Sequence, residues 1–177
     1  AERSFTYWRA DAAARQLATD PARLERSLEN QALVYFSGIT VAILEPGHRR
    51  VLLDAIVGAR KAGSLVAFDA NYRPRLWPSA DVARAALDEA LAVADVALPT
   101  FPDEHDLHGD ASPDATAKRL AANGVREIVV KNGEAPALVT FDGDVEIVPA
   151  VHVDQPLDTT GAGDSFNGSY LAARLAG

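Results

Sequence analysis

Short apolar runs alternate along the chain with longer stretches in which apolar positions recur at helical spacing. The short runs predict buried β-strands at 32–36, 65–69, 96–98 and 127–131. The longer stretches predict amphipathic helices at 46–62, 79–92 and 113–122. Strands and helices that alternate in this way form a largely parallel sheet covered by helices, so the pattern predicts an α/β fold.

The pattern changes late in the chain. Two apolar runs at 137–141 and 145–149 flank Asp142 and Gly143, a pair typical of the tight turn in an antiparallel hairpin. Further helices are expected at 10–18, 21–29 and 165–175. The chain contains no internal repeat and no low-complexity linker, so we expect residues 1–177 to form a single domain.

Polar residues follow three of the predicted strands at the point where each strand ends. Ligands of open α/β sheets bind beyond the carboxyl ends of the strands, and a parallel sheet would gather these residues on one rim. They are Asp69, Asn71 and Arg73 after the second strand, Thr100, Asp103 and Glu104 after the third, and Lys131 and Gly133 after the fourth.

The segment from Asp158 to Asp164 reads D-T-T-G-A-G-D and leads directly into the last predicted helix. The first turn of a helix offers backbone N–H groups without internal acceptors, and glycine lets an anion come close to them. A carboxylate beside an anion site is suited to phosphoryl transfer, since Asp164 could accept the proton of an attacking hydroxyl. The alternatives are a plain turn with Asp164 as helix cap and a dinucleotide-binding loop. The dinucleotide loop fits poorly because the preceding residues, 154–157, are polar and contain a proline.

This segment resembles the second signature of the PfkB (ribokinase-like) family of carbohydrate kinases, D-T-x-G-A-G-D-x-F-x-G, as far as Gly168. The resemblance implies a ribokinase-like three-layer αβα sandwich with a largely parallel sheet and a late antiparallel hairpin. It implies ATP and Mg²⁺ as cofactors. It also implies that Asp164 is the catalytic base, that Gly161, Ala162 and Gly163 form the anion hole, and that Thr160 contacts the nucleotide.

Other segments resemble the branch of this family that handles fructose and sugar acids. The string from Phe68 to Trp77 is similar to F-D-x-N-x-R-x-x-L-W, which implies that Asn71 and Arg73 lie near the nucleotide phosphates. Lys131 and Gly133 resemble the K-x-G segment that lines the nucleotide site. Alternatively, Arg73 could simply pair with Asp69 in a surface salt-bridge network, and Trp77 could simply pack.

Tyr7 and Arg9 resemble the Tyr-x-Arg segment that contacts the sugar acid in kinases of 2-keto-3-deoxygluconate. The expected reaction is therefore phosphorylation of the primary hydroxyl of a sugar acid, giving the 6-phosphate of 2-keto-3-deoxygluconate. The alternatives are a fructokinase or ribokinase, or a nucleotide-binding fragment that is inactive on its own.

The family's N-x-x-E segment, which supports Mg²⁺ through water, falls here on Thr100 to Asp103, with Glu104 next in sequence. Asp103 and Glu104 are both candidates for that role. His105 and His108 lie among Asp103, Asp106 and Asp110 and would allow a zinc site. We interpret these acids instead as a solvated helix face.

Composition restricts the partners. The net charge is −8 and no basic run is present, which argues against a nucleic-acid partner. No apolar run approaches the length of a membrane span. The absence of cysteine excludes disulfides and is compatible with the cytoplasm. Methionine is absent even at position 1, and the family resemblance implies that an N-terminal third and a C-terminal end are missing. The parent protein is expected to be a homodimer.

Overall fold

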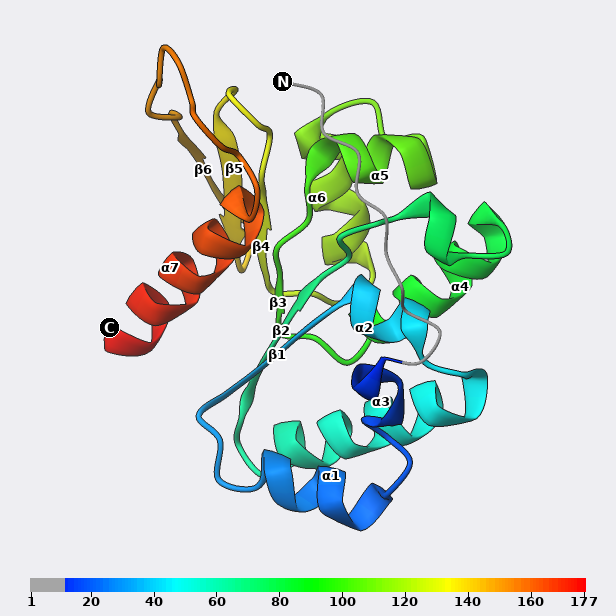
Figure 1. The fold of residues 1–177 in the computed structure, drawn as a ribbon. Helices are drawn as coiled ribbons and strands as arrows, with labels where there is room; N and C mark the ends of the chain where they lie inside the picture. The colour runs from blue at the N-terminus through cyan, green and yellow to red at the C-terminus, as the bar shows by residue number, and fades with distance from the viewer. Residues whose placement is uncertain (1–11) are drawn as a thin grey trace.

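The computed structural model describes residues 12–177, and these contain one sheet in the order β1-β2-β3-β4-β5-β6. Its strands are β1 (Leu33–Ser37), β2 (Leu65–Asp69), β3 (Val96–Ala97), β4 (Glu127–Val130), β5 (Ala137–Phe141) and β6 (Asp144–Val148). Strands β1 to β4 run parallel, and β5 and β6 form an antiparallel hairpin at the edge (Figure 1). The predicted parallel sheet and late hairpin are confirmed.

Helices cover both faces of the sheet (Figure 1). They are α1 (Pro21–Leu28), α2 (Gly38–Ile43), α3 (Pro46–Lys61), α4 (Ala80–Leu91), α5 (Phe101–His108), α6 (Pro113–Ala122) and α7 (Ala162–Ala176), with 3₁₀ turns η1 (Ala13–Gln16) and η2 (Pro74–Leu76). Successive strand residues point to opposite faces. Phe68 accordingly packs in the core under α1 to α6, whereas Ala67 packs with Leu171 of α7. The three-layer arrangement predicted from the sequence is therefore present.

Local sequence signals set several helix starts. Asp20, Ser79 and Ser112 each accept a hydrogen bond from a backbone N–H in the first turn of α1, α4 and α6. A cap of this kind stabilises a helix by about 1 kcal/mol. Caps therefore help to fix where these helices begin, including the start of α4 expected at Ser79.

Two elements differ from the predictions. Residues 38–43 form the helix α2 although they are rich in β-branched side chains, because packing buries Val41 and outweighs helix propensity. The first predicted helix, 10–18, is only a 3₁₀ turn over Ala13–Gln16 in the part that the structure describes.

The junction between β1 and α2 requires glycine. A Cβ at Gly38 would lie 1.8 Å from the carbonyl oxygen of Ala70. That distance is too short for any residue with a side chain, so only glycine fits there. This contact places the end of β1 directly against the loop that follows β2. Among the described residues no helix is both long and apolar enough to cross a membrane.

Candidate active site

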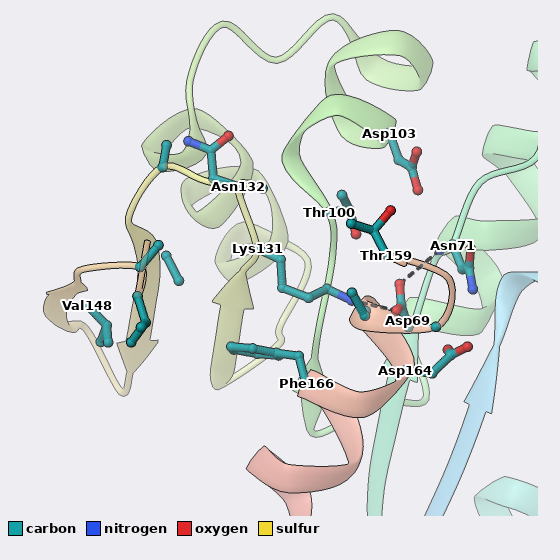
Figure 2. Close-up of a pocket in the computed structure, with 18 of the residues that line it drawn as sticks. Asp69, Asn71, Thr100, Asp103, Lys131, Asn132, Val148, Thr159, Asp164 and Phe166 are labelled. Atoms are coloured by element: carbon teal, nitrogen blue, oxygen red, sulfur yellow. Dashed lines mark hydrogen bonds and ion pairs between the residues drawn. The ribbon is translucent and has the colours of Figure 1, made fainter. Parts of the chain in front are cut away.

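A cleft of about 690 Å³ opens at the carboxyl ends of the parallel strands, between the hairpin and the start of α7. Its wall includes Asn71, Arg73, Asp103, Lys131, Gly133, Gly161, Ala162, Gly163 and Asp164. These residues come from the loops after β2 and β4, from α5 and from the start of α7 (Figure 2). The structure therefore brings together most of the site residues predicted from the sequence.

The start of α7 leaves backbone donors open toward this cleft. Gly161 caps the helix in the left-handed region with φ 74°, a conformation that glycine adopts without strain. The N–H of Ala162 donates to Thr159 O at 3.1 Å, and the N–H of Ser165 donates to Gly161 O at 2.8 Å. No acceptor among the described residues takes the N–H of Gly163 or of Asp164.

Asp164 lies in the first turn of the same helix with an exposed side chain. Its carboxylate stands at the wall of the cleft rather than in the core (Figure 2). A carboxylate can accept a proton there, while the two open amides beside it can hold negative charge.

Beneath this turn lies a buried polar cluster. Lys131 Nζ donates to Asp69 Oδ2 at 2.7 Å and to Asn167 Oδ1 at 3.0 Å, and Asn167 Nδ2 donates to Asp69 Oδ2 at 2.7 Å. The ammonium of Lys131 also lies 3.8 Å from the place where a Cβ on Gly163 would be. Lys131 is thus a cleft residue whose charge is already paired with a carboxylate.

The loop after β2 contributes Asn71 and Arg73 to the cleft wall. Asn71 has φ 38°, and its N–H donates to Asp69 Oδ1 at 3.0 Å. Arg73 Nη1 lies 3.5 Å from Asp103 Oδ2 across the cleft. Burial raises the pKa of Asp103 above its usual value, and the nearby Arg73 opposes that shift.

The two acids predicted to support magnesium are separated by the structure. Asp103 lines the cleft. Glu104 is 1% exposed, lies outside the cleft wall, and pairs with Arg119 of α6 at 2.6 Å. Burial raises the pKa of Glu104 to about 7 against the attraction of Arg119.

The interpretation of Asp103, Asp106 and Asp110 as a solvated helix face was wrong for Asp110, because this carboxylate forms an ion pair with Arg119. His105 Nδ1 lies 2.9 Å from Asp110 O and is thereby turned to the backbone. No group of three or more His, Cys, Asp or Glu side chains within residues 12–177 is arranged to hold a metal ion.

Thr160, like Glu104, is a predicted site residue that lies outside the cleft wall, and Thr159 lines the cleft instead. The N–H of Thr160 donates to Asp158 Oδ1 at 2.8 Å, which turns the loop. Tyr7 and Arg9 lie outside the described residues.

Two further sets of residues at this site were not predicted from the sequence. Val148, Pro149, Ala150 and Val151 form an apolar wall, and no local pattern distinguishes them from the rest of the hairpin. Asn167 was also missed, although its position three residues after Asp164 places it on a neighbouring part of the same helix face.

A largely parallel sheet with a glycine-rich helix start at its carboxyl edge is the architecture of the PfkB fold. A solved PfkB protein from a Polaromonas species matches 86% of this chain and 49% of its own, with a TM-score of 0.74 and 28% identity. The model of the pfkB family of carbohydrate kinases matches residues 1–177, and the chain belongs to that family.

Individual relatives are similar over almost the whole chain. The 2-dehydro-3-deoxygluconokinase of Dickeya dadantii is 41% identical over 99% of this chain and 58% of its own. The enzyme of the same name from Escherichia coli is 40% identical over 99% of this chain and 59% of its own. The chain therefore spans less than two thirds of the length of these relatives.

Proposed function

We propose that the protein carrying this chain transfers a phosphoryl group from ATP to the primary hydroxyl of a sugar acid. One observation carries the proposal: at the wall of a cleft of about 690 Å³, the exposed carboxylate of Asp164 lies beside the N–H groups of Gly163 and Asp164, which have no acceptor within residues 12–177. Positioning and charge stabilisation are the main contributions that a protein makes to this reaction.

In the proposed reaction, Asp164 accepts the proton of the attacking hydroxyl. The N–H groups of Gly163 and Asp164 hold the charge on the phosphoryl oxygens. Ala162 and Gly161 shape the anion hole without donating to the phosphoryl oxygens. The N–H of Ala162 is already bonded to Thr159 O, and the left-handed conformation of Gly161 sets the direction in which the backbone enters α7.

The residues around the cleft fit a nucleotide and its metal. Arg73 and Asn71 offer hydrogen-bond donors to the phosphates, and Lys131 and Gly133 also line the cleft. Residues 148–151 give an apolar surface for the nucleobase of the nucleotide. Mg²⁺ supplies neutralisation of phosphate charge when bound. Asp103 is the cleft carboxylate that would hold its waters, because Glu104 is paired with Arg119.

The names of the relatives favour 2-keto-3-deoxygluconate, also called 2-dehydro-3-deoxygluconate, as the acceptor. Tyr7 and Arg9 are the proposed contacts to that acceptor. A cytoplasmic location and a homodimer stay predictions.

A substrate panel with the full-length protein tests the proposal. We expect ATP-dependent phosphorylation of 2-keto-3-deoxygluconate, with fructose and ribose as poorer acceptors. Asp164→Asn should lower kcat by at least about 10²-fold, because it removes a positioned base. Asp114→Asn makes the same chemical change in the first turn of α6 and should leave kcat unchanged.

Three results would point elsewhere. Preference for fructose or ribose would favour those kinases. Nucleotide binding by calorimetry without turnover of any acceptor would favour a binding module. Full activity of the Asp164→Asn variant would exclude the proposed base.

A further inference from the structure

A polar cluster lies under the first turn of α7, where an apolar cluster would be expected. Asn167 is 1% exposed, Asp69 is 2% exposed and Lys131 is 8% exposed. Buried polar groups are costly unless they are hydrogen-bonded, and here the bonds are short. Lys131 Nζ and Asn167 Nδ2 each donate to Asp69 Oδ2 at 2.7 Å.

Asn167 joins this cluster to the helix that carries Asp164. Its Oδ1 accepts from Lys131 at 3.0 Å, and its Nδ2 also donates to the hydroxyl of Tyr35 at 3.2 Å. Asn167 is the third residue after Asp164, slightly less than one helical turn along α7. Any rotation or sliding of α7 that moved Asp164 would therefore stretch the bonds of Asn167.

Asp69 joins the same cluster to the loop after β2, which also lines the cleft. Its Oδ1 accepts the N–H of Asn71 at 3.0 Å, and Asn71 has φ 38°. Asparagine enters this left-handed region more readily than most residues, and the bond from its N–H to Asp69 stabilises that conformation here. Asp69 thus bonds Asn71 through Oδ1, and it bonds Lys131 and the α7 residue Asn167 through Oδ2; Figure 2 shows Asp69 between Lys131 and Asn71.

Apolar contacts alone would hold α7 less specifically. Leu171 packs α7 against Ala67, Val96, Leu98 and Val129, and such contacts set a distance but are non-directional. Hydrogen bonds depend on angle as well as distance. A fully bonded cluster can therefore fix both the rotation and the height of a helix.

We propose that Asp69, Lys131 and Asn167 form a positioning unit that sets the first turn of α7 against the Asn71 loop. The three side chains act through the groups they hold, so that the Asp164 carboxylate and the open amides face the same part of the cleft as Asn71. The inference rests on the proposed function, in which Asp164 is the base.

Exchanging the two partners tests this unit in the full-length protein. Asn167→Asp places a second carboxylate against Asp69, and Asp69→Asn removes the charge that pairs with Lys131. The double variant restores one carboxylate, one amide and one ammonium. We expect each single variant to lower kcat by about 10- to 100-fold, the scale of a small misplacement of catalytic groups, with much smaller changes in KM.

The double variant should recover most of the lost kcat, because the coupling between contacting residues is then restored. A second readout does not use activity. Hydrogen exchange of the amides at 161–165 in the ligand-free protein should speed up in the single variants and slow again in the double variant.

Two controls separate positioning from stability and from the proposed function. Tyr170→Phe removes the bond from α7 to Glu127 at 2.8 Å. It should lower the melting temperature and leave kcat unchanged. Asp164→Asn is measured alongside: if it stays fully active, the proposed function fails, whereas the exchange results still report on the unit.

The inference is overturned if Asn167→Asp keeps wild-type kcat and exchange, or if the double variant is no better than the worse single variant. Asn167→Leu decides the matter should a charge variant not fold. It keeps the Asp69–Lys131 pair, and unchanged kcat and exchange in that variant would likewise reject the positioning role.

Discussion

The two glycines at the start of α7, Gly161 and Gly163, are required for different reasons. Gly161 needs its left-handed backbone, with φ 74°. Gly163 has ordinary helical geometry, and an added Cβ would meet only Lys131 Nζ, at 3.8 Å. The folded chain could therefore accept a side chain at 163, so the reason for glycine lies in the cleft rather than in the fold.

Replacing Gly163 by alanine should separate folding from function. We expect the melting temperature to stay the same or rise slightly, since alanine favours helix. The new methyl group would stand beside the open amides, and kcat/KM for ATP should fall by about tenfold or more, because close approach to the backbone is lost. Steady-state kinetics and thermal unfolding of the full-length protein measure the two effects.

Gly58→Ala is the matched control, because it lies on the exposed side of α3 with nothing near the added Cβ. It should give the same gain in helix stability without a kinetic effect. Unchanged kcat/KM in Gly163→Ala would show that no ligand group approaches the backbone there.

At the scale of elements, α5 and α6 are joined by a buried ion-pair network. Glu104 pairs with Arg119 at 2.6 Å, and Arg119 also binds Asp110 at 2.8 Å. Glu104 adjoins Asp103 of the cleft in sequence, so the network holds the helix that presents Asp103. Its protonation therefore bears on the stability of one wall of the site.

The pH dependence of stability should carry the signature of Glu104. Burial raises the pKa of this carboxyl from 4.5 to about 7, so between these values the folded protein holds a proton that the unfolded chain releases. Its contribution to stability is complete below pH 4.5 and is lost as the pH rises through about 7. Over that interval the free energy of unfolding should fall, relative to Glu104→Gln, by on the order of 1–3 kcal/mol.

Urea unfolding of both proteins across this pH range measures the difference. Asp106→Asn, which removes an exposed carboxylate of the same helix, controls for a change in net charge. Parallel curves for wild type and Glu104→Gln would contradict a raised pKa at Glu104.

The sequence predicted strands and rim residues better than it predicted the contacts between them. A buried parallel strand leaves a local signal in the sequence, because both of its faces are covered and its residues are mostly apolar. The strand 127–130, with the sequence E-I-V-V, is an example. The partners of Glu104 and Asn167 are 15 and 98 residues away, and no local pattern records them. The helix α2 was missed for the same reason, since its stability comes from burial of Val41.

At the scale of the whole molecule, the cleft is assembled from segments far apart in the chain. Its walls come from the loop after β2 and from the start of α7, which Asp69 and Asn167 connect through one bond at 2.7 Å. A ligand that contacts both walls should stabilise both together, and its binding free energy adds to that of folding.

We therefore expect a non-hydrolysable ATP analogue with Mg²⁺ to raise the melting temperature of the full-length protein in a concentration-dependent way. At about 100 times its Kd, such a ligand adds about 2.7 kcal/mol to the free energy of unfolding. Hydrogen exchange should slow at 69–73 and at 161–165 together, whereas the exposed hairpin turn at Asp142 should be unaffected. Slowing at only one of the two segments would mean that the nucleotide binds one wall alone, and the chain would then need another element to bring its phosphates to Asp164.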